Sequence, residues 1–131
     1  MHALLILDMQ VGLVNGPDKP FGAEALVARL NQLMVDARQA GAPVFLARHV
    51  GPVGSPIEPG SPLTELVPAL ELEGSEVIFE KTRPSAFAGT GLAERLRPER
   101  LMLIGDVEGV FDADGAIIPR ITPANPDEVS A

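Results

Sequence analysis

Residues 3–10, with the sequence ALLILDMQ, decide how the rest of this chain is interpreted. Residues 3–7 form a short, continuously apolar run, which is typical of a strand buried on both faces of a parallel sheet. Asp8 follows this run directly. The stretch therefore predicts a buried strand with a carboxylate at its carboxyl end.

The rest of the chain alternates apolar strand-like segments with helical ones. Apolar segments predict strands at residues 43–48, 76–80 and 101–104, and helices are predicted at 23–40 and 91–97. Residues 11–22 and 50–63 are rich in Gly and Pro and are predicted to be loops, with a helical turn at 64–67. This alternation predicts an α/β fold, a three-layer α/β/α sandwich with a mostly parallel sheet of about four strands. Residues 106–131 are predicted to be an irregular tail.

The longer predicted helix has an apolar stripe and recognisable ends. Leu26, Leu30, Leu33 and Ala37 recur at helical spacing, which predicts that they face the core. Gly41 is placed to end this helix in the left-handed conformation. Thr90 is placed to cap the helix at 91–97.

Length and composition restrict the class of protein. At 131 residues the chain fits one domain, residues 1–131. A net charge of −8 leaves no basic patch for phosphates, which argues against a nucleic-acid partner. No stretch approaches a membrane span, and residues 3–7 are too short for a secretory signal. We therefore expect a cytoplasmic protein with no membrane partner.

Two charged residues follow predicted strands. Asp8 ends the first strand and Lys81 follows the strand at 76–80. Because ligands of open α/β sheets bind at the carboxyl ends of the strands, the two side chains could form an ion pair beside a pocket, with Asp8 as acid or base. The alternative is that Asp8 caps a loop and Lys81 is a solvated charge. The first interpretation predicts that the two charged groups lie within reach of a salt bridge.

Short sequence motifs in a fixed order favour the first interpretation. These motifs are LLILDMQ at 4–10, Arg48-His49, Gly-Ser-Pro at 54–56 and 60–62, Glu80-Lys81, Ser85-Ala86-Phe87, and Gly89-Thr90. With them, the chain resembles the isochorismatase-like hydrolases, also called the cysteine hydrolase superfamily, over residues 3–105.

The resemblance implies a Rossmann-like sheet topology and a catalytic triad. In this family an Asp deprotonates a nucleophilic Cys, a Lys orients groups and stabilises charge, and backbone amides hold the oxyanion. Asp8 and Lys81 match two of these three roles, and Gln10 and Phe87 would line the substrate pocket. No cofactor is implied. Some relatives bind a metal after the second strand, but residues 50–63 supply no further His or Asp beside His49, so we expect no metal and a packing role for His49.

The third catalytic role is unfilled, because the chain contains no Cys. In the family the Cys lies shortly beyond the Gly that matches Gly105. Here Gly105 is followed directly by residues 106–112, DVEGVFD, which resemble a later segment of the family. About one strand and one helix of the family would therefore be absent between Gly105 and Asp106. The alternative is that residues 106–112 are an unrelated loop.

Two functions follow from these observations. The first is a family hydrolase, acting on or descended from enzymes acting on a small amide, imide or vinyl ether, and impaired or inactive as a pseudoenzyme. Family members that cleave vinyl ethers through the Asp have no Cys. The second is a non-catalytic binding or assembly module of the same fold. A homo-oligomer is expected, or a tail that covers the exposed sheet with its apolar residues Val107, Val110, Phe111, Ile117 and Ile118.

Overall fold

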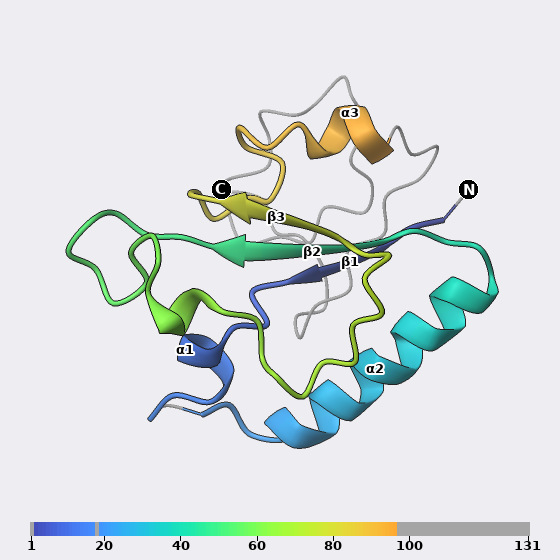
Figure 1. Cartoon of the computed structure of the whole chain (residues 1–131), viewed down its shortest axis with the longest axis horizontal. Coiled ribbons are helices and arrows are strands. Elements are labelled where there is room, and N and C mark those ends of the chain that lie inside the picture. Colours follow the sequence, from blue (N-terminus) through green and yellow to red (C-terminus); the bar gives the residue numbers. More distant parts are fainter. Residues whose placement is uncertain (1, 18, 97–131) are drawn as a thin grey trace, which may run out of the picture. The chain divides into compact units, whose positions relative to one another are not determined.

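The computed structural model describes residues 2–17 and 19–96, and contacts divide the chain after Pro98, so every element named below belongs to the first unit. Three strands, β1 (Leu4–Leu7), β2 (Val44–His49) and β3 (Val77–Lys81), form a parallel sheet in the order β1-β2-β3 (Figure 1). The predicted parallel α/β class is confirmed. The predicted strand at 101–104 and the tail at 106–131 lie outside the described residues.

The register of the sheet brings the carboxyl ends of the strands together. Leu7 of β1 pairs with Ala47 of β2, and the backbone N–H of Asp8 donates to the Ala47 carbonyl at 3.1 Å. At the other side of β2, His49 pairs with Lys81, the last residue of β3. The side chains that follow these strands are therefore neighbours at one edge of the sheet.

Two apolar clusters lie on opposite faces of the sheet. Helix α2 (Ala23–Gln39) covers one face, and α3 (Leu92–Leu96) lies on the other side (Figure 1). The buried residues of the α2 cluster are Ile6, Met9, Val14, Ala23, Val27, Met34, Val44, Leu46, Val67 and Leu70. Those of the α3 cluster are Phe45, Ala86 and Leu92, with Leu5, Val77, Phe79, Phe87 and Leu96 partly buried. The alternation of Val44, Phe45 and Leu46 between the clusters follows from the two-residue period of a strand.

The face that α2 turns to the sheet differs from the predicted stripe. Ala23, Val27 and Met34 are buried, whereas Leu26 and Leu33 are 44% and 41% exposed. The helix carries two adjoining apolar stripes, and the sheet accepts the one that begins with the small Ala23. The prediction that Leu26 and Leu33 face the core is therefore wrong, while Leu30 and Ala37 pack against the core from its margin.

The end of α2 has the predicted geometry. Gly41 has φ +69°, its N–H donates to the Arg38 carbonyl at 3.0 Å, and the Ala42 N–H donates to the Ala37 carbonyl at 2.8 Å. These two bonds are those of a Schellman motif, which requires a residue that tolerates positive φ at this point. The predicted left-handed role of Gly41 is confirmed.

Arg38, in the last turn of α2, holds the segment that leads into β3. Its guanidinium donates to the Glu71 carbonyl at 3.0 Å and pairs with Glu73 at 3.3 Å and with Glu76. Burial raises the pKa of Glu76, but hydrogen bonds from backbone N–H groups and from Arg38 outweigh it and lower the pKa from 4.5 to about 2. These contacts fix the start of the strand that carries Lys81.

Two short helical segments interrupt regions predicted as loops. Helix α1 (Val11–Val14) begins directly after Gln10, within the predicted loop 11–22. A 3-10 turn, η1 (Pro62–Thr64), forms where Ser61 caps the Leu63 N–H, earlier than the helical turn predicted at 64–67. At α3, Thr90 Oγ1 accepts from the Leu92 N–H at 3.3 Å, which confirms its predicted capping role.

Candidate active site

Asp8 occupies a strained turn at the carboxyl end of β1. Its φ is +59°, and among the described residues it is the one non-glycine residue in the left-handed region. Asp is one of the few residues that enter this region, because its short side chain can bond locally. The side chain is 40% exposed, yet its Oδ1 atom is buried and accepts no hydrogen bond from any described residue. Strain and an unsatisfied buried oxygen at one residue are typical of functional sites.

Lys81 lies beside this carboxylate. The side chain is 1% exposed, and Nζ is 3.2 Å from Asp8 Oδ1, so the predicted proximity of the two charges is confirmed. The hydrogens of Nζ are directed elsewhere: to His49 Nδ1 at 3.0 Å, the Arg83 carbonyl at 3.2 Å and the Pro84 carbonyl at 3.0 Å. An ammonium has three hydrogens, so these acceptors account for all of them. Lys81 therefore stabilises the carboxylate by charge and leaves Oδ1 without a donor.

His49 belongs to the site, although the sequence indicated only a packing role. Its Nδ1 contacts Lys81 Nζ directly. The signal was available in the strands, because His49 and Lys81 end neighbouring parallel strands and pair in register. The predicted second strand stopped at Arg48, one residue too early to place His49 on that edge.

Gln10 lies behind the site rather than open to solvent. The residue is 0% exposed, its Nε2 donates to the carbonyls of His49 at 2.9 Å and Thr64 at 3.0 Å, and its Oε1 accepts from the His49 N–H at 2.6 Å. Both amide hydrogens are thus used within the protein. The side chain joins the end of β2 to η1, and its predicted contact with substrate stays a prediction.

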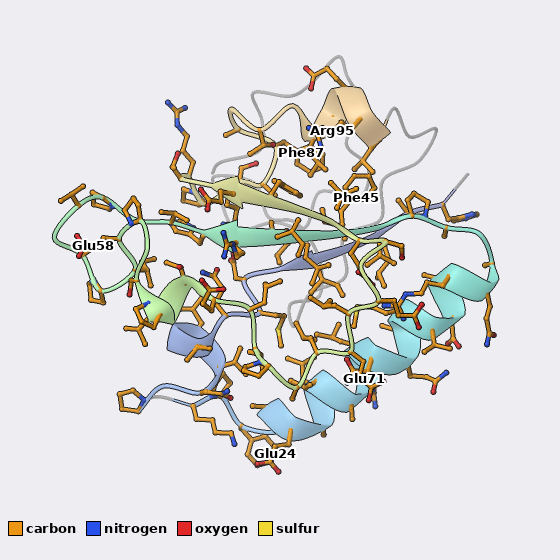
Figure 2. The ribbon with its side chains drawn as sticks, in the orientation of Figure 1. Glu24, Phe45, Glu58, Glu71, Phe87 and Arg95 are labelled. Carbon is orange, nitrogen blue, oxygen red and sulfur yellow. The ribbon has the colours of Figure 1, made fainter. Side chains whose placement is uncertain are left out.

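Phe87 packs on the α3 side of the sheet. Figure 2 shows its ring on the same side as Phe45, and it is a partly buried member of the α3 cluster. The backbone N–H of Phe87 donates to Ser85 Oγ at 3.3 Å, which shapes the segment that follows Lys81. Its role in lining a substrate pocket also stays a prediction.

Residues 2–17 and 19–96 hold no group of three or more His, Cys, Asp or Glu side chains placed to bind a metal ion. Within the same residues, no helix has the length and apolar character needed to cross a membrane. The charged and titratable side chains that meet at the site are Asp8, Lys81 and His49.

The chain is similar in sequence to known proteins. The family model described as the isochorismatase domain matches residues 2–105. A secreted isochorismatase effector of Verticillium dahliae is 30% identical over 106 residues, covering 78% of this chain and 56% of that protein. Streptothricin hydrolase of Streptomyces noursei is 33% identical over 96 residues, covering 73% of this chain and 35% of that protein.

Solved structures agree with the sequence comparison. The crystal structure of an isochorismatase from Pseudomonas putida has 37% sequence identity and a TM-score of 0.64, covering 72% of this chain and 49% of that chain. The chain spans about half of that structure's length, 56% of the Verticillium protein and 35% of the Streptomyces protein. The family model covers well over half of the present sequence, and this chain belongs to the isochorismatase family of hydrolases.

Proposed function

We propose that this chain binds a small amide, imide or vinyl ether at the Asp8–Lys81 edge and has lost thiol-dependent hydrolysis. The observation that carries the proposal is the buried Oδ1 of Asp8, which has the Lys81 ammonium at 3.2 Å but accepts no hydrogen bond from the described residues. The Asp8 side chain as a whole is 40% exposed, so a substrate N–H or O–H can approach the carboxylate from its exposed side. Small neutral ligands suit the site because the two charges already balance each other.

The loss of hydrolysis follows from the chemistry that remains. Acyl transfer needs a nucleophile, a base that activates it and donors for the oxyanion. Asp8 can serve as the base, and Lys81 stabilises its charge. The 131 residues contain no Cys, and Ser85, four residues after Lys81, accepts a hydrogen bond from the Phe87 N–H. The thiol nucleophile that acyl transfer uses in this family is therefore missing from the sequence.

Binding and turnover are tested separately. Nicotinamide, succinimide and a simple vinyl ether are titrated into the protein and followed by NMR chemical shifts, and hydrolysis is followed by chromatography. We expect shifts at Asp8 and Lys81 with at least one of these ligands, no hydrolysis, and loss of the shifts in Asp8→Asn. The matched control is Asp36→Asn, an exposed Asp of α2 bonded to Gln32, which should bind as the wild type does.

Three results would overturn parts of this proposal. Hydrolysis abolished by Asp8→Asn would refute the loss of activity and assign Asp8 a catalytic role in cleavage. Hydrolysis or binding unchanged by Asp8→Asn would place the site elsewhere. Absence of binding to all three ligand classes would favour the assembly function over the ligand-binding one.

The assembly function has its own supporting observation. Phe21, just before α2, is fully exposed, and Leu26 and Leu33 on α2 are 44% and 41% exposed. Apolar surface of this kind favours association. We propose a homo-oligomer on this basis, and the cytoplasmic location expected from the sequence stays a proposal. Sedimentation of the wild type against a Leu26→Glu, Leu33→Glu variant tests it, and a monomeric wild type would exclude it.

A further inference from the structure

We propose that His49 is a positioning residue that keeps the Lys81 ammonium turned away from Asp8 Oδ1, and that Gln10 holds His49 in place. This inference rests on the proposed function, in which the Asp8 carboxylate must keep its accepting strength for a ligand. It assigns to His49 a task that its sequence context did not suggest.

The direction of the hydrogen bond between Lys81 and His49 is set by chemistry. An ammonium group can only donate, so His49 Nδ1, 3.0 Å from Nζ, must be the acceptor and carry no hydrogen. A neutral imidazole with a bare Nδ1 carries its hydrogen on Nε2. His49 is therefore neutral in this arrangement and has one defined tautomer.

The three acceptors of Lys81 explain why Asp8 has none of its hydrogens. Two hydrogens are taken by the carbonyls of Arg83 and Pro84, in the segment that follows β3. The third is taken by His49 Nδ1, although Asp8 Oδ1 is only 3.2 Å from the same nitrogen. If His49 offered no acceptor, that hydrogen would turn to Oδ1, because a charged acceptor at this distance is the strongest alternative. The Asp8 carboxylate would then be stabilised by a donor within the protein and would accept more weakly from a ligand.

Gln10 makes the position of His49 rigid. Its amide bonds both the N–H and the carbonyl of His49, at 2.6 and 2.9 Å, and adds a third bond to Thr64. All of these bonds are made by a side chain that is 0% exposed. Since the backbone of His49 is held at two points, its ring has little freedom to leave Lys81. Gln10 thus acts on Asp8 through His49 and Lys81.

The composition of the chain makes this arrangement measurable. The sequence contains two His, His2 and His49, and two Lys, Lys19 and Lys81. In nitrogen-15 spectra of the imidazoles of the full chain, His49 should show an unprotonated Nδ1 and a protonated Nε2, with exposed His2 as the internal reference. A protonated Nδ1 in the wild type would overturn the inference without any variant.

The second measurement is reductive methylation of the lysines, read by mass spectrometry. Lys81 should react far more slowly than Lys19, whose side chain is 46% exposed. His49→Asn keeps an acceptor near the Nδ1 position and should protect Lys81 as the wild type does. His49→Leu removes the acceptor, so the hydrogen should turn to Asp8 Oδ1. Lys81 should then stay protected, while ligand binding in the titration should weaken by about tenfold, the effect expected for diverting one charge-assisted hydrogen bond. Lys19 should react equally in all three proteins.

The ligand titration separates the two proposals. With the tautomer and the protection as described, failure of every ligand to bind would refute the proposed function and leave the role of His49 intact. If ligands bind His49→Leu as tightly as they bind the wild type, the positioning role is wrong and the proposed function stands. Should His49→Leu fail to fold, the wild-type tautomer and the rescue by His49→Asn still decide.

Discussion

The backbone of Asp8 predicts that Gly at this position is more stabilising than Ala, the reverse of the usual order. Holding an L-residue in the left-handed region costs about 1–2 kcal/mol relative to the ordinary helical region, and Asp8 has φ +59°. Gly is free of this cost but loses about 0.4–1 kcal/mol more chain entropy on folding than Ala does. Asp8→Gly should therefore be more stable than Asp8→Ala by about 1 kcal/mol, since both variants lose the same carboxylate.

The assay is urea unfolding of both variants, with a control pair on α2. Gln32 is an exposed helical residue, so Gln32→Gly should be less stable than Gln32→Ala by about 1 kcal/mol, the opposite order. Comparing Gly with Ala at each position cancels the lost side chains. If Asp8→Ala equals or exceeds Asp8→Gly in its free energy of unfolding, the turn after β1 is not left-handed in solution, and the argument that Asp8 is held under strain fails.

Three further predictions concern the framework of the site. Met34→Ala should lower the free energy of unfolding by about 2–5 kcal/mol because Met34 is 0% exposed. Leu33→Ala should lower it by less than about 1 kcal/mol because Leu33 is 41% exposed. Equal losses of the two variants in urea unfolding would contradict the observed face of α2. Gly41→Ala should cost about 1 kcal/mol, the cost of its φ of +69° less the chain entropy that Ala saves, since a Cβ there meets no atom within 4 Å. Glu76 has its pKa lowered from 4.5 to about 2, so its ionised form should stabilise the fold by up to about 3 kcal/mol above pH 4.5, and this stabilisation should be lost as the pH falls towards 2. A Glu76→Gln variant should therefore be less stable than the wild type at pH 6 and closer to it at pH 2. A difference in the free energy of unfolding that does not shrink over this range would refute the assignment.

Sequence reasoning located the charged pair because strand ends obey a simple rule. Asp8 and Lys81 each follow a short apolar run, and parallel strands bring their carboxyl ends to one edge. Gly41 was equally accessible, since only a residue tolerant of positive φ ends a helix in this way. These features depend on local chemistry and on the direction of the strands, both of which the sequence records.

Other features depended on information that the sequence does not record. The burial of Val27 rather than Leu26 depends on how far α2 is rotated against the sheet, and two adjoining apolar stripes left that rotation open. The contact of His49 with Lys81 depends on strand register, and the strand was predicted to end one residue early. The burial of Gln10 depends on the contacts of its amide with His49 and Thr64, which no sequence pattern indicated.

The Asp8–Lys81 edge is energetically costly, although the chain has no Cys for it to activate. The left-handed Asp8, the desolvated Lys81 and the unsatisfied Oδ1 each raise the free energy of the folded state. They coincide at one edge, and the hydrogen bonds that the side chains of Gln10 and His49 accept there maintain the arrangement instead of relaxing it. Packing alone gives no reason for a carboxylate oxygen that is buried beside an ammonium yet accepts none of its hydrogens. The same side chain is 40% exposed, so a ligand donor can approach the carboxylate from its exposed side. Ligand binding, measured before turnover, is therefore the informative experiment on this edge.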